Sequence, residues 1–349
     1  MVKNFFRNFS DYFVSDIAMD LGTANTLVYV KNQGIILNEP SVVAVSNNNG
    51  HGGYGEPVAV GLEAKQMYGR THNKLRTIRP MKDGVIADFE ITNTMIKYFI
   101  QKVLKNYRFI KPRMVVGIPT CITQVEKKAV IDAATMSGVR EVHLVEEPMA
   151  AAIGVGIPVH KAEGNMVVDI GGGTTDVAVT SLSAIAYGES IRVAGDELDE
   201  SILRYMRLQH HLNIGIFEAE RVKIQIGSAY PVQPALTTEV RGLNVKTGVP
   251  TSIVVNDEEI REAMKEPISA IITVLMRALE KTPPELSADI YSNGIYLTGG
   301  GALIRGLDKL IEDATNLKTF VPDEPLLSIV KGAGMVLDNF DTMRKVCIN

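Results

Sequence analysis

One pattern occurs twice in this chain and limits its fold more than any other feature. The copies span residues 17–30 and 166–179 and align without a gap at an offset of 149 residues. Each copy is an apolar run, then Asp-x-Gly with a small polar turn, then a second apolar run. This order predicts two β-hairpins with acidic, glycine-rich tips. Two copies indicate two related halves, whose turns grip one ligand between them.

The composition limits the class of protein. At 349 residues, of which 46% are hydrophobic, the chain is long enough for two domains. A net charge of -4 without a basic run argues against nucleic acid as a partner. Cys121 and Cys347 are far apart, which is typical of a reducing, cytoplasmic setting. We expect neither a secretory signal nor a membrane-spanning segment.

Strand and helix patterns alternate along the chain. Residues 113–118 are typical of a buried strand. Thr123 and Glu126 have the spacing of a capping box and begin a helix that Gly138 ends. A long helix is expected over residues 257–279.

The two Asp-x-Gly turns have the chemistry of a phosphate site. Their backbone N–H groups lie on residues with little or no side chain, and such nests bind phosphate oxygens. The carboxylates of Asp20 and Asp169 repel phosphate and are suited to hold a hydrated Mg²⁺ that bridges phosphates. Further hydrogen-bond donors come from Thr23, Asn25, Thr174 and Thr175. One such turn is weak evidence, but two in the same register predict a nucleotide-phosphate clamp.

Other common sites are absent from the sequence. It has no P-loop, no His-Glu-x-x-His pair and no Gly-x-Ser-x-Gly nucleophile turn. The glycines at 299–301 lack the third spaced glycine of a dinucleotide-binding turn. They can still let the backbone approach a base or ribose closely, and the alternative is a structural turn.

Two adjacent carboxylates, Glu146 and Glu147, precede a helix that Pro148 begins. The helix dipole favours the ionised form of a carboxylate there. An ionised carboxylate near a metal-bound triphosphate can orient and polarise an attacking water. The alternative role is that of a simple N-terminal cap.

The first residues of the chain combine aromatic and basic side chains. Apolar residues recur at helical spacing over residues 2–14, with Lys3 and Arg7 on the other face. This predicts an amphipathic helix, which either packs on the body or anchors the chain in a lipid interface. The aromatic residues in question are Phe5, Phe6, Phe9 and Phe13.

Taken together, the motifs resemble a known superfamily. The paired turns, with residues 145–154, 297–301 and 332–335, are similar to those of the actin, Hsp70 and sugar-kinase superfamily. Within it, nearly the whole chain resembles the MreB family of bacterial actins. The stretches that carry this closer likeness are residues 20–26, 38–43, 194–200 and 280–286.

The resemblance implies an actin-like α/β fold, with two related RNase H-like lobes and four subdomains around a nucleotide cleft. The boundaries that we expect are an N-terminal helix over 1–14, lobe I over 15–157 with subdomain IB inserted at about 38–82, lobe II over 158–334 with subdomain IIB inserted at about 195–257, and a C-terminal helix over 335–349 that returns to subdomain IA.

Residue roles follow from the same resemblance. Asp20 and Asp169 order Mg²⁺ through water, Glu147 polarises the attacking water, and Thr174 helps to position it. Glu220 and Lys223 match positions that face the ribose. The nucleotide-binding residues implied are Gly22, Thr23, Ala24, Asn25, Gly171, Gly172, Gly173, Thr174, Glu220, Lys223, Gly299, Gly300 and Gly301. The chain departs from the family at Asp176, where members usually carry glutamate.

The resemblance further implies a Mg²⁺-dependent ATPase, with GTP as the alternative nucleotide. Such a protein forms filaments of paired protofilaments and determines cell shape. We expect it in the cytoplasm, on the inner face of the membrane, through the aromatic start and an apolar loop at Phe109 and Ile110. Its other partners are shape or motility proteins, in a walled or a wall-less cell.

Two alternatives belong to other classes of function. A small-molecule kinase of the same superfamily needs a separate catalytic base, and the sequence offers none beyond Glu147. A nucleotide-binding scaffold that does not hydrolyse its ligand has the same turns, and a phosphate-release assay separates it from an ATPase.

Overall fold

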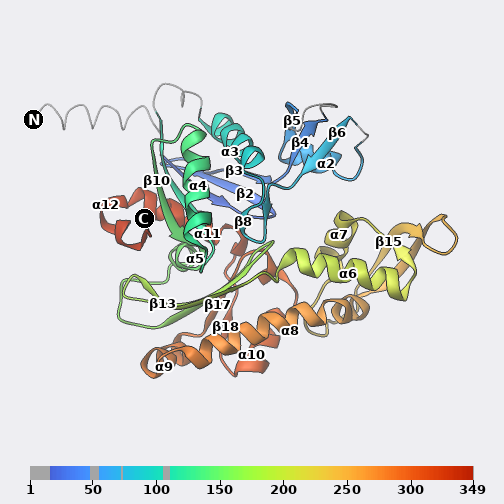
Figure 1. Ribbon diagram of the computed structural model, residues 1–349. Helices are drawn as coiled ribbons and strands as arrows, with labels where there is room; N and C mark the ends of the chain where they lie inside the picture. Colours follow the sequence, from blue (N-terminus) through green and yellow to red (C-terminus); the bar gives the residue numbers. More distant parts are fainter. Residues whose placement is uncertain (1–15, 48–54, 72–73, 105–110, 349) are drawn as a thin grey trace, which may run out of the picture. The chain divides into compact units, whose positions relative to one another are not determined.

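The computed structural model describes residues 16–47, 55–71, 74–104 and 111–348 (Figure 1). The chain divides into two compact units. Unit 1 contains Met1–Pro158 and Leu327–Asn349, and unit 2 contains Val159–Leu326. The predicted helix over 1–14 and the apolar loop with Phe109 and Ile110 lie outside the described residues.

Unit 1 is built on a five-stranded sheet with the order β10-β9-β1-β2-β3. Strand β1 pairs antiparallel with β2 and parallel with β9, so it is enclosed on both edges. The strands are β1 (Ile17–Leu21), β2 (Asn25–Val30), β3 (Gly34–Pro40), β9 (Arg113–Ile118) and β10 (Glu141–Glu146).

Helices cover both faces of this sheet. The alternation of side chains along β1 turns Ile17 and Met19 toward α3 and α4, whose apolar residues complete one core. On the other face α11 packs against β1, β9 and α5. These helices are α3 (Phe89–Val103), α4 (Gln124–Met136), α5 (Glu147–Gly154) and α11 (Ser328–Asp338). The capping box of Thr123 and Glu126 is confirmed.

The rest of unit 1 consists of small elements. A three-stranded sheet with the order β5-β4-β6 is followed by the short hairpin β7-β8. The C-terminal residues form α12 and a short 3-10 helix. The bounds are β4 (Val43–Ser46), β5 (Pro57–Val60), α2 (Leu62–Met67), β6 (Leu75–Ile78), β7 (Met81–Lys82), β8 (Val85–Ile86), α12 (Phe340–Met343), η2 (Pro325–Leu327) at the junction of the units, and η3 (Arg344–Val346).

Unit 2 repeats the central pairing. In the sheet β13-β12-β11-β17-β18, strand β11 pairs antiparallel with β12 and parallel with β17. The duplicated sequence pattern therefore forms the same hairpin in both units. The strands are β11 (Asn165–Ile170), β12 (Thr175–Ser181), β13 (Ala184–Ile191), β17 (Ile295–Thr298) and β18 (Thr319–Phe320).

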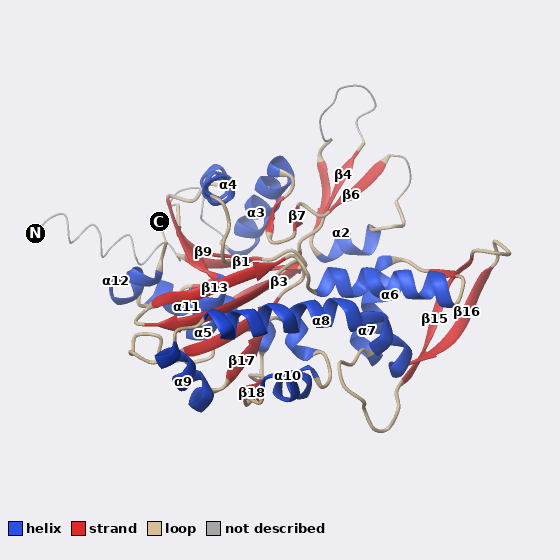
Figure 2. Cartoon of the chain, turned by 60° about the horizontal axis from the view of Figure 1, so that its bottom comes forward, coloured by secondary structure: helices blue, strands red, loops and turns tan. Residues whose placement is uncertain are grey.

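A second sheet and several helices complete unit 2. The long helix α8 packs on β12 and β13, and the hairpin β15-β16 lies beside α7 (Figure 2). The elements are α6 (Gly195–Gln209), β14 (Leu212–Asn213), α7 (Ile216–Ile226), β15 (Thr237–Asn244), β16 (Pro250–Asn256), α8 (Asp257–Lys281), α9 (Pro284–Asn293), η1 (Gly300–Leu303) and α10 (Leu307–Thr315).

The chain returns to unit 1 after Leu326. The lobe boundaries expected from the sequence, with lobe II over 158–334, stay a prediction. Helix α11 packs against α5 and β1, and the carbonyl oxygen of its first residue, Ser328, lies against Gly154 of α5. Among the described helices, none combines the length and apolarity that a membrane span requires.

Helices α5 and α11 cross at two glycines. A Cβ on Gly154 would collide with the carbonyl oxygen of Ser328, and one on Gly332 would collide with that of Ala150. The two backbones are therefore in direct contact, which only glycine allows. This contact fixes α5, and with it Glu147, against the sheet.

Gly332→Ala should destabilise the protein by about 2–3 kcal/mol, because the added methyl group forces the helices apart. In an uncrowded helix interior the same change stabilises by up to about 1 kcal/mol. Urea unfolding followed by circular dichroism measures the difference. Met335→Ala, at a half-exposed position of the same helix, is the control and should change stability by less than about 0.5 kcal/mol. A stabilised Gly332→Ala variant would contradict the crossing.

Candidate nucleotide-binding site

The first turn lies between β1 and β2, and it is tight. Leu21 ends β1 and Asn25 begins β2. A Cβ at Gly22 would lie 2.6 Å from the carbonyl oxygen of Asn25, so a larger residue does not fit. Asp20 is 7% exposed, near the carboxyl end of its strand.

Ser41, which the sequence analysis did not select, holds this turn. Its hydroxyl donates to the carbonyl oxygen of Gly22 at 2.7 Å, and its backbone N–H donates to that of Ala24 at 2.9 Å. Thr26 lies 2.9 Å from the same hydroxyl oxygen and donates to it, because the single Ser41 proton is already used. Because Ser41 binds the carbonyl groups of Gly22 and Ala24, the conformation of the turn is fixed in the ligand-free protein.

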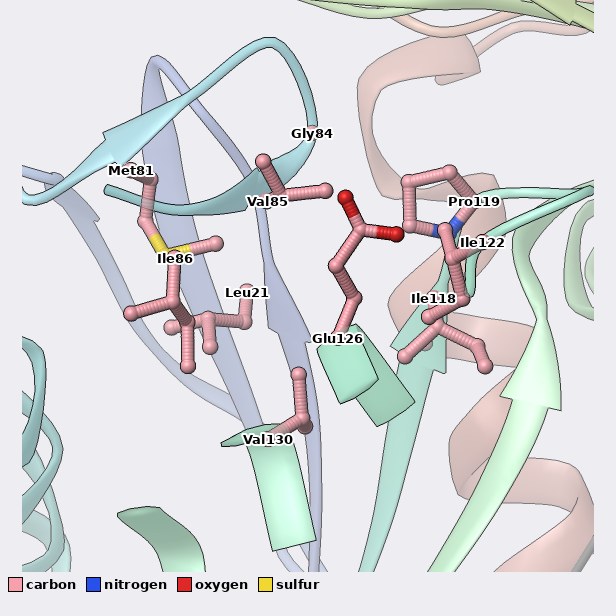
Figure 3. Close-up of a pocket in the computed structure, with 11 residues that line it drawn as sticks. Leu21, Met81, Gly84, Val85, Ile86, Ile118, Pro119, Ile122, Glu126 and Val130 are labelled. Atoms are coloured by element: carbon pink, nitrogen blue, oxygen red, sulfur yellow. The ribbon is translucent and has the colours of Figure 1, made fainter. Parts of the chain in front are cut away.

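The β7-β8 hairpin also reaches the first turn. The N–H of Gly84 donates to the hydroxyl oxygen of Thr23 at 3.0 Å. Beside this contact lies a pocket with mostly apolar walls (Figure 3). Leu21, Val85 and Pro119 line it, together with the side chain of Glu126.

The second turn, between β11 and β12, has a comparable frame. The N–H of Gly171 donates to the carbonyl oxygen of Thr174 at 2.9 Å and closes the turn. The first N–H groups of α6, from Gly195 and Asp196, donate to the carbonyl oxygens of Gly171 and Gly172 at 3.1 and 2.7 Å. These carbonyl groups therefore point toward α6, which reduces their repulsion of a phosphate at the turn.

Asp169 is almost completely buried, with 1% exposure. It accepts a hydrogen bond of 2.8 Å from the hydroxyl of Thr298 on the parallel neighbour β17. Burial raises the pKa of this carboxyl to about 7, the Thr298 hydroxyl opposes the rise, and the carboxylate of Asp176 adds to it. Asp176 is the direct partner of Asp169 in the β11-β12 register.

These carboxylates fit a hydrated cation. A buried aspartate whose ionised form is disfavoured gains from a nearby positive charge. No group of three or more His, Cys, Asp or Glu in the described part of the chain is arranged to hold a metal directly. Asp20 in unit 1 and Asp169 in unit 2 each have the chemistry to contact Mg²⁺ through water.

Glu147 lies beside Asp20 in unit 1. It is the first residue of α5 and is 7% exposed. Gly117 pairs with Asp20 in the sheet, and a Cβ there would lie 3.6 Å from Cγ of Glu147. The N-cap position belongs to Glu146, whose side chain makes no capping hydrogen bond. The structure therefore does not support a role as a simple helix cap for either Glu146 or Glu147.

In unit 2, Lys223 connects α7 to the start of α6. Its ammonium donates to the carbonyl oxygen of Gly195 at 2.8 Å and lies 2.8 Å from the carboxylate of Asp199. Burial raises the pKa of Asp199 to about 6, although Lys223 opposes the rise. The N–H of Gly195 also donates to the carbonyl oxygen of Gly171. Gly195 therefore connects Lys223, a predicted ribose residue, to the predicted phosphate turn.

The glycine turn after β17 packs on the end of β11. A side chain at Gly299 or Gly301 would collide with Ile170, the residue that precedes the second turn. Gly299 also has a φ of 77°, which favours glycine. The structure thus brings three predicted groups together within unit 2, namely the turn at 171–174, Lys223 of α7 and the turn at 299–301.

Comparison with known proteins agrees with this architecture. The family model described as MreB/Mbl protein matches residues 14–345. The cell shape-determining protein MreB of Escherichia coli (strain K12) is 49% identical over 336 residues, which are 96% of each chain. MreB5 of Spiroplasma citri bound to ADP superposes with a TM-score of 0.88 at 35% identity, over 93% of this chain and 97% of that one.

A more distant likeness concerns the fold alone. A chain of the MamK double helical filament superposes with a TM-score of 0.76 at 22% identity, over 93% of this chain and 99% of that one. The fold is therefore the actin-like α/β fold, as the sequence predicted. Within that class, the chain belongs to the MreB/Mbl family.

Thr298→Val should destabilise the ligand-free protein by about 1–3 kcal/mol at pH 8.5, because Asp169 loses a buried donor. Since the pKa of Asp169 is raised to about 7, the folded state favours its protonated form, and stability from this group falls as the pH rises through 7. Thr298 opposes that fall, so the cost should be smaller at pH 5.5.

Urea unfolding at both pH values measures this cost. Thr180→Val is the control, because Thr180 is equally buried but makes only a long bond of 3.4 Å to a neutral carbonyl. Equal, pH-independent costs in the two variants would show that Thr298 does not stabilise the Asp169 carboxylate.

Proposed function

We propose that this protein is a filament-forming ATPase that determines or maintains cell shape. The observation that carries the proposal is the pair of buried aspartates, Asp20 and Asp169, each next to a rigid turn rich in backbone N–H groups. Two such turns match the needs of a polyphosphate with Mg²⁺. ATP is the proposed nucleotide, since related MreB5 structures contain ADP and AMPPNP, both adenine nucleotides.

Different residues bind different parts of the nucleotide in this proposal. The turns at 22–25 and 171–174 hold the phosphates, the second through the N–H groups at 172–174, and Lys223 with Glu220 faces the ribose. The turn at 299–301 lies against the adenosine. When bound, Mg²⁺ neutralises charge on the phosphates. Asp20 and Asp169 hold its water ligands, and their burial makes those hydrogen bonds strong.

Glu147 and Thr174 carry the hydrolytic step in this proposal. The Glu147 carboxylate accepts a hydrogen bond from the attacking water and orients its oxygen toward the γ-phosphorus. The hydroxyl of Thr174 helps to position the attacking water. Hydrolysis then changes the preferred arrangement of the units, and with it the contacts between subunits.

Glu147→Gln should slow phosphate release by about 100-fold or more while ADP affinity stays within about twofold, because only the water loses its partner. Single-turnover phosphate release and calorimetric titration measure the two quantities. Glu146→Gln, one residue earlier and half-buried, is the control and should release phosphate at nearly the wild-type rate. Unchanged release by Glu147→Gln removes this residue from the mechanism, and no release by the wild type indicates a scaffold that only binds.

Self-association is the second part of the proposal, with paired protofilaments as its form. The MamK chain of the same fold is part of a double helical filament. ATP and Mg²⁺ should increase light scattering by this protein, and electron microscopy should show filaments. A protein that stays monomeric at high concentration under these conditions would contradict the proposal.

Attachment to the inner face of the membrane is the third part. Its support is the aromatic and basic pattern of residues 2–14 and the apolar pair Phe109 and Ile110. The full chain should sediment with liposomes that contain anionic lipid, and a chain without residues 1–14 should sediment several-fold less. Equal sedimentation of both chains would remove the N-terminus from membrane binding.

A further inference from the structure

Two segments of unit 2 that are distant in sequence run side by side. One is 227–230, which follows α7, and the other is 304–306, which follows the glycine turn and η1. Ser228 and Arg305 form a parallel bridge, and the N–H of Ala229 donates to the carbonyl oxygen of Arg305 at 2.8 Å. Gly306 has a φ of 71°, and a Cβ there would lie 2.5 Å from Cβ of Tyr230.

The side chain of Arg305 strengthens this contact. Its guanidinium Nη1 donates to the carbonyl oxygens of Ile224 at 3.2 Å and Gly227 at 3.3 Å. Ile224 lies in the last turn of α7, and Gly227 is the C-cap of that helix. Carbonyl groups at a helix C-terminus lack intrahelical partners, and a cation there also interacts favourably with the helix dipole. Arg305 therefore caps α7.

The capped segment is also held from a second helix. Arg261 of α8 donates to the hydroxyl of Ser228 at 3.0 Å and to the carboxylate of Asp257 at 3.0 Å. Ser228 is completely buried. The end of α7 is thus fixed to the body of unit 2 by Arg261, and the glycine turn is joined to that fixed point by Arg305.

We propose that Arg305 is a positioning residue for the nucleoside, one that sets the spacing between the ribose helix α7 and the adenosine turn at 299–301. The inference rests on the proposed nucleotide site, because Lys223 and Gly299–Gly301 are its nucleoside-facing groups. Arg305 acts through these elements and does not touch the ligand. A site whose two walls are held at a fixed distance loses less freedom on binding, so its affinity is higher.

The test is calorimetric titration of the full chain with ADP and Mg²⁺. Arg305→Ala should weaken ADP binding by about fivefold to tenfold, because two charge-assisted hydrogen bonds are lost. The stoichiometry should remain one, since the protein stays folded. Arg305→Lys should recover part of the affinity, because an ammonium can still donate to one carbonyl group. Lys309→Ala removes the same charge from an exposed position of α10 and should bind ADP like the wild type.

Each outcome separates this inference from the proposed function. If the wild type binds no ADP, the proposed function fails first. If the wild type binds and Arg305→Ala binds within twofold of it, Arg305 does not position the nucleoside. If Arg305→Ala instead binds ADP at a lower stoichiometry, with a lower melting temperature but the affinity of the wild type, Arg305 only stabilises the fold. This result also overturns the inference. Loss in Lys309→Ala equal to that in Arg305→Ala assigns the effect to net charge and also overturns it.

Discussion

In both units a buried aspartate-bearing strand pairs antiparallel with the next strand and parallel with a later one. In unit 1 this strand is β1, between β2 and β9, and in unit 2 it is β11, between β12 and β17. The antiparallel partner forces a tight turn directly after the aspartate. The parallel partner ends at the same edge, so its following loop lies next to that turn. The turn at 299–301 reaches its place through this rule. Glu147 follows β10, which is parallel to β9 and lies one strand further from β1.

Burial of an ionised carboxylate costs free energy, and a hydrogen bond to the carboxylate reduces this cost. The pKa of Asp169 rises to about 7 because the folded chain offers it little solvation. A single hydroxyl, from Thr298, stabilises its ionised form. In the proposed site a hydrated cation would supply the missing positive charge, at the cost of lower stability in the ligand-free protein.

Local patterns in the sequence predicted the elements, because their causes are local. The two hairpins, the capping box at Thr123 and the strand at 113–118 each depend on neighbouring residues. A 3-10 turn at Gly300–Leu303 follows the glycine turn and precedes α10, which begins at Leu307. Gly306, with its φ of 71°, is the N-cap of α10 and marks its true start.

The supporting contacts of the site could not be predicted. Ser41, Thr298 and Arg305 bind backbone or carboxylate groups that are remote in sequence, and no spacing rule connects them. The same holds for the return to unit 1 at Leu327, which depends on the fit of Gly332 against α5. Sequence patterns therefore predicted the groups that we propose to face the ligand, and tertiary contacts determine how rigidly those groups are held.

The central proposal is that the two Asp-x-Gly turns bind a single nucleotide. Calorimetric titration with ADP and Mg²⁺ tests it most directly when Asp20→Ala and Asp169→Ala are measured beside the wild type. The account predicts one ADP per chain and a loss of affinity of about tenfold or more in each variant, since both aspartates serve one metal. Two ADP molecules per chain, or full affinity with either aspartate removed, would contradict it.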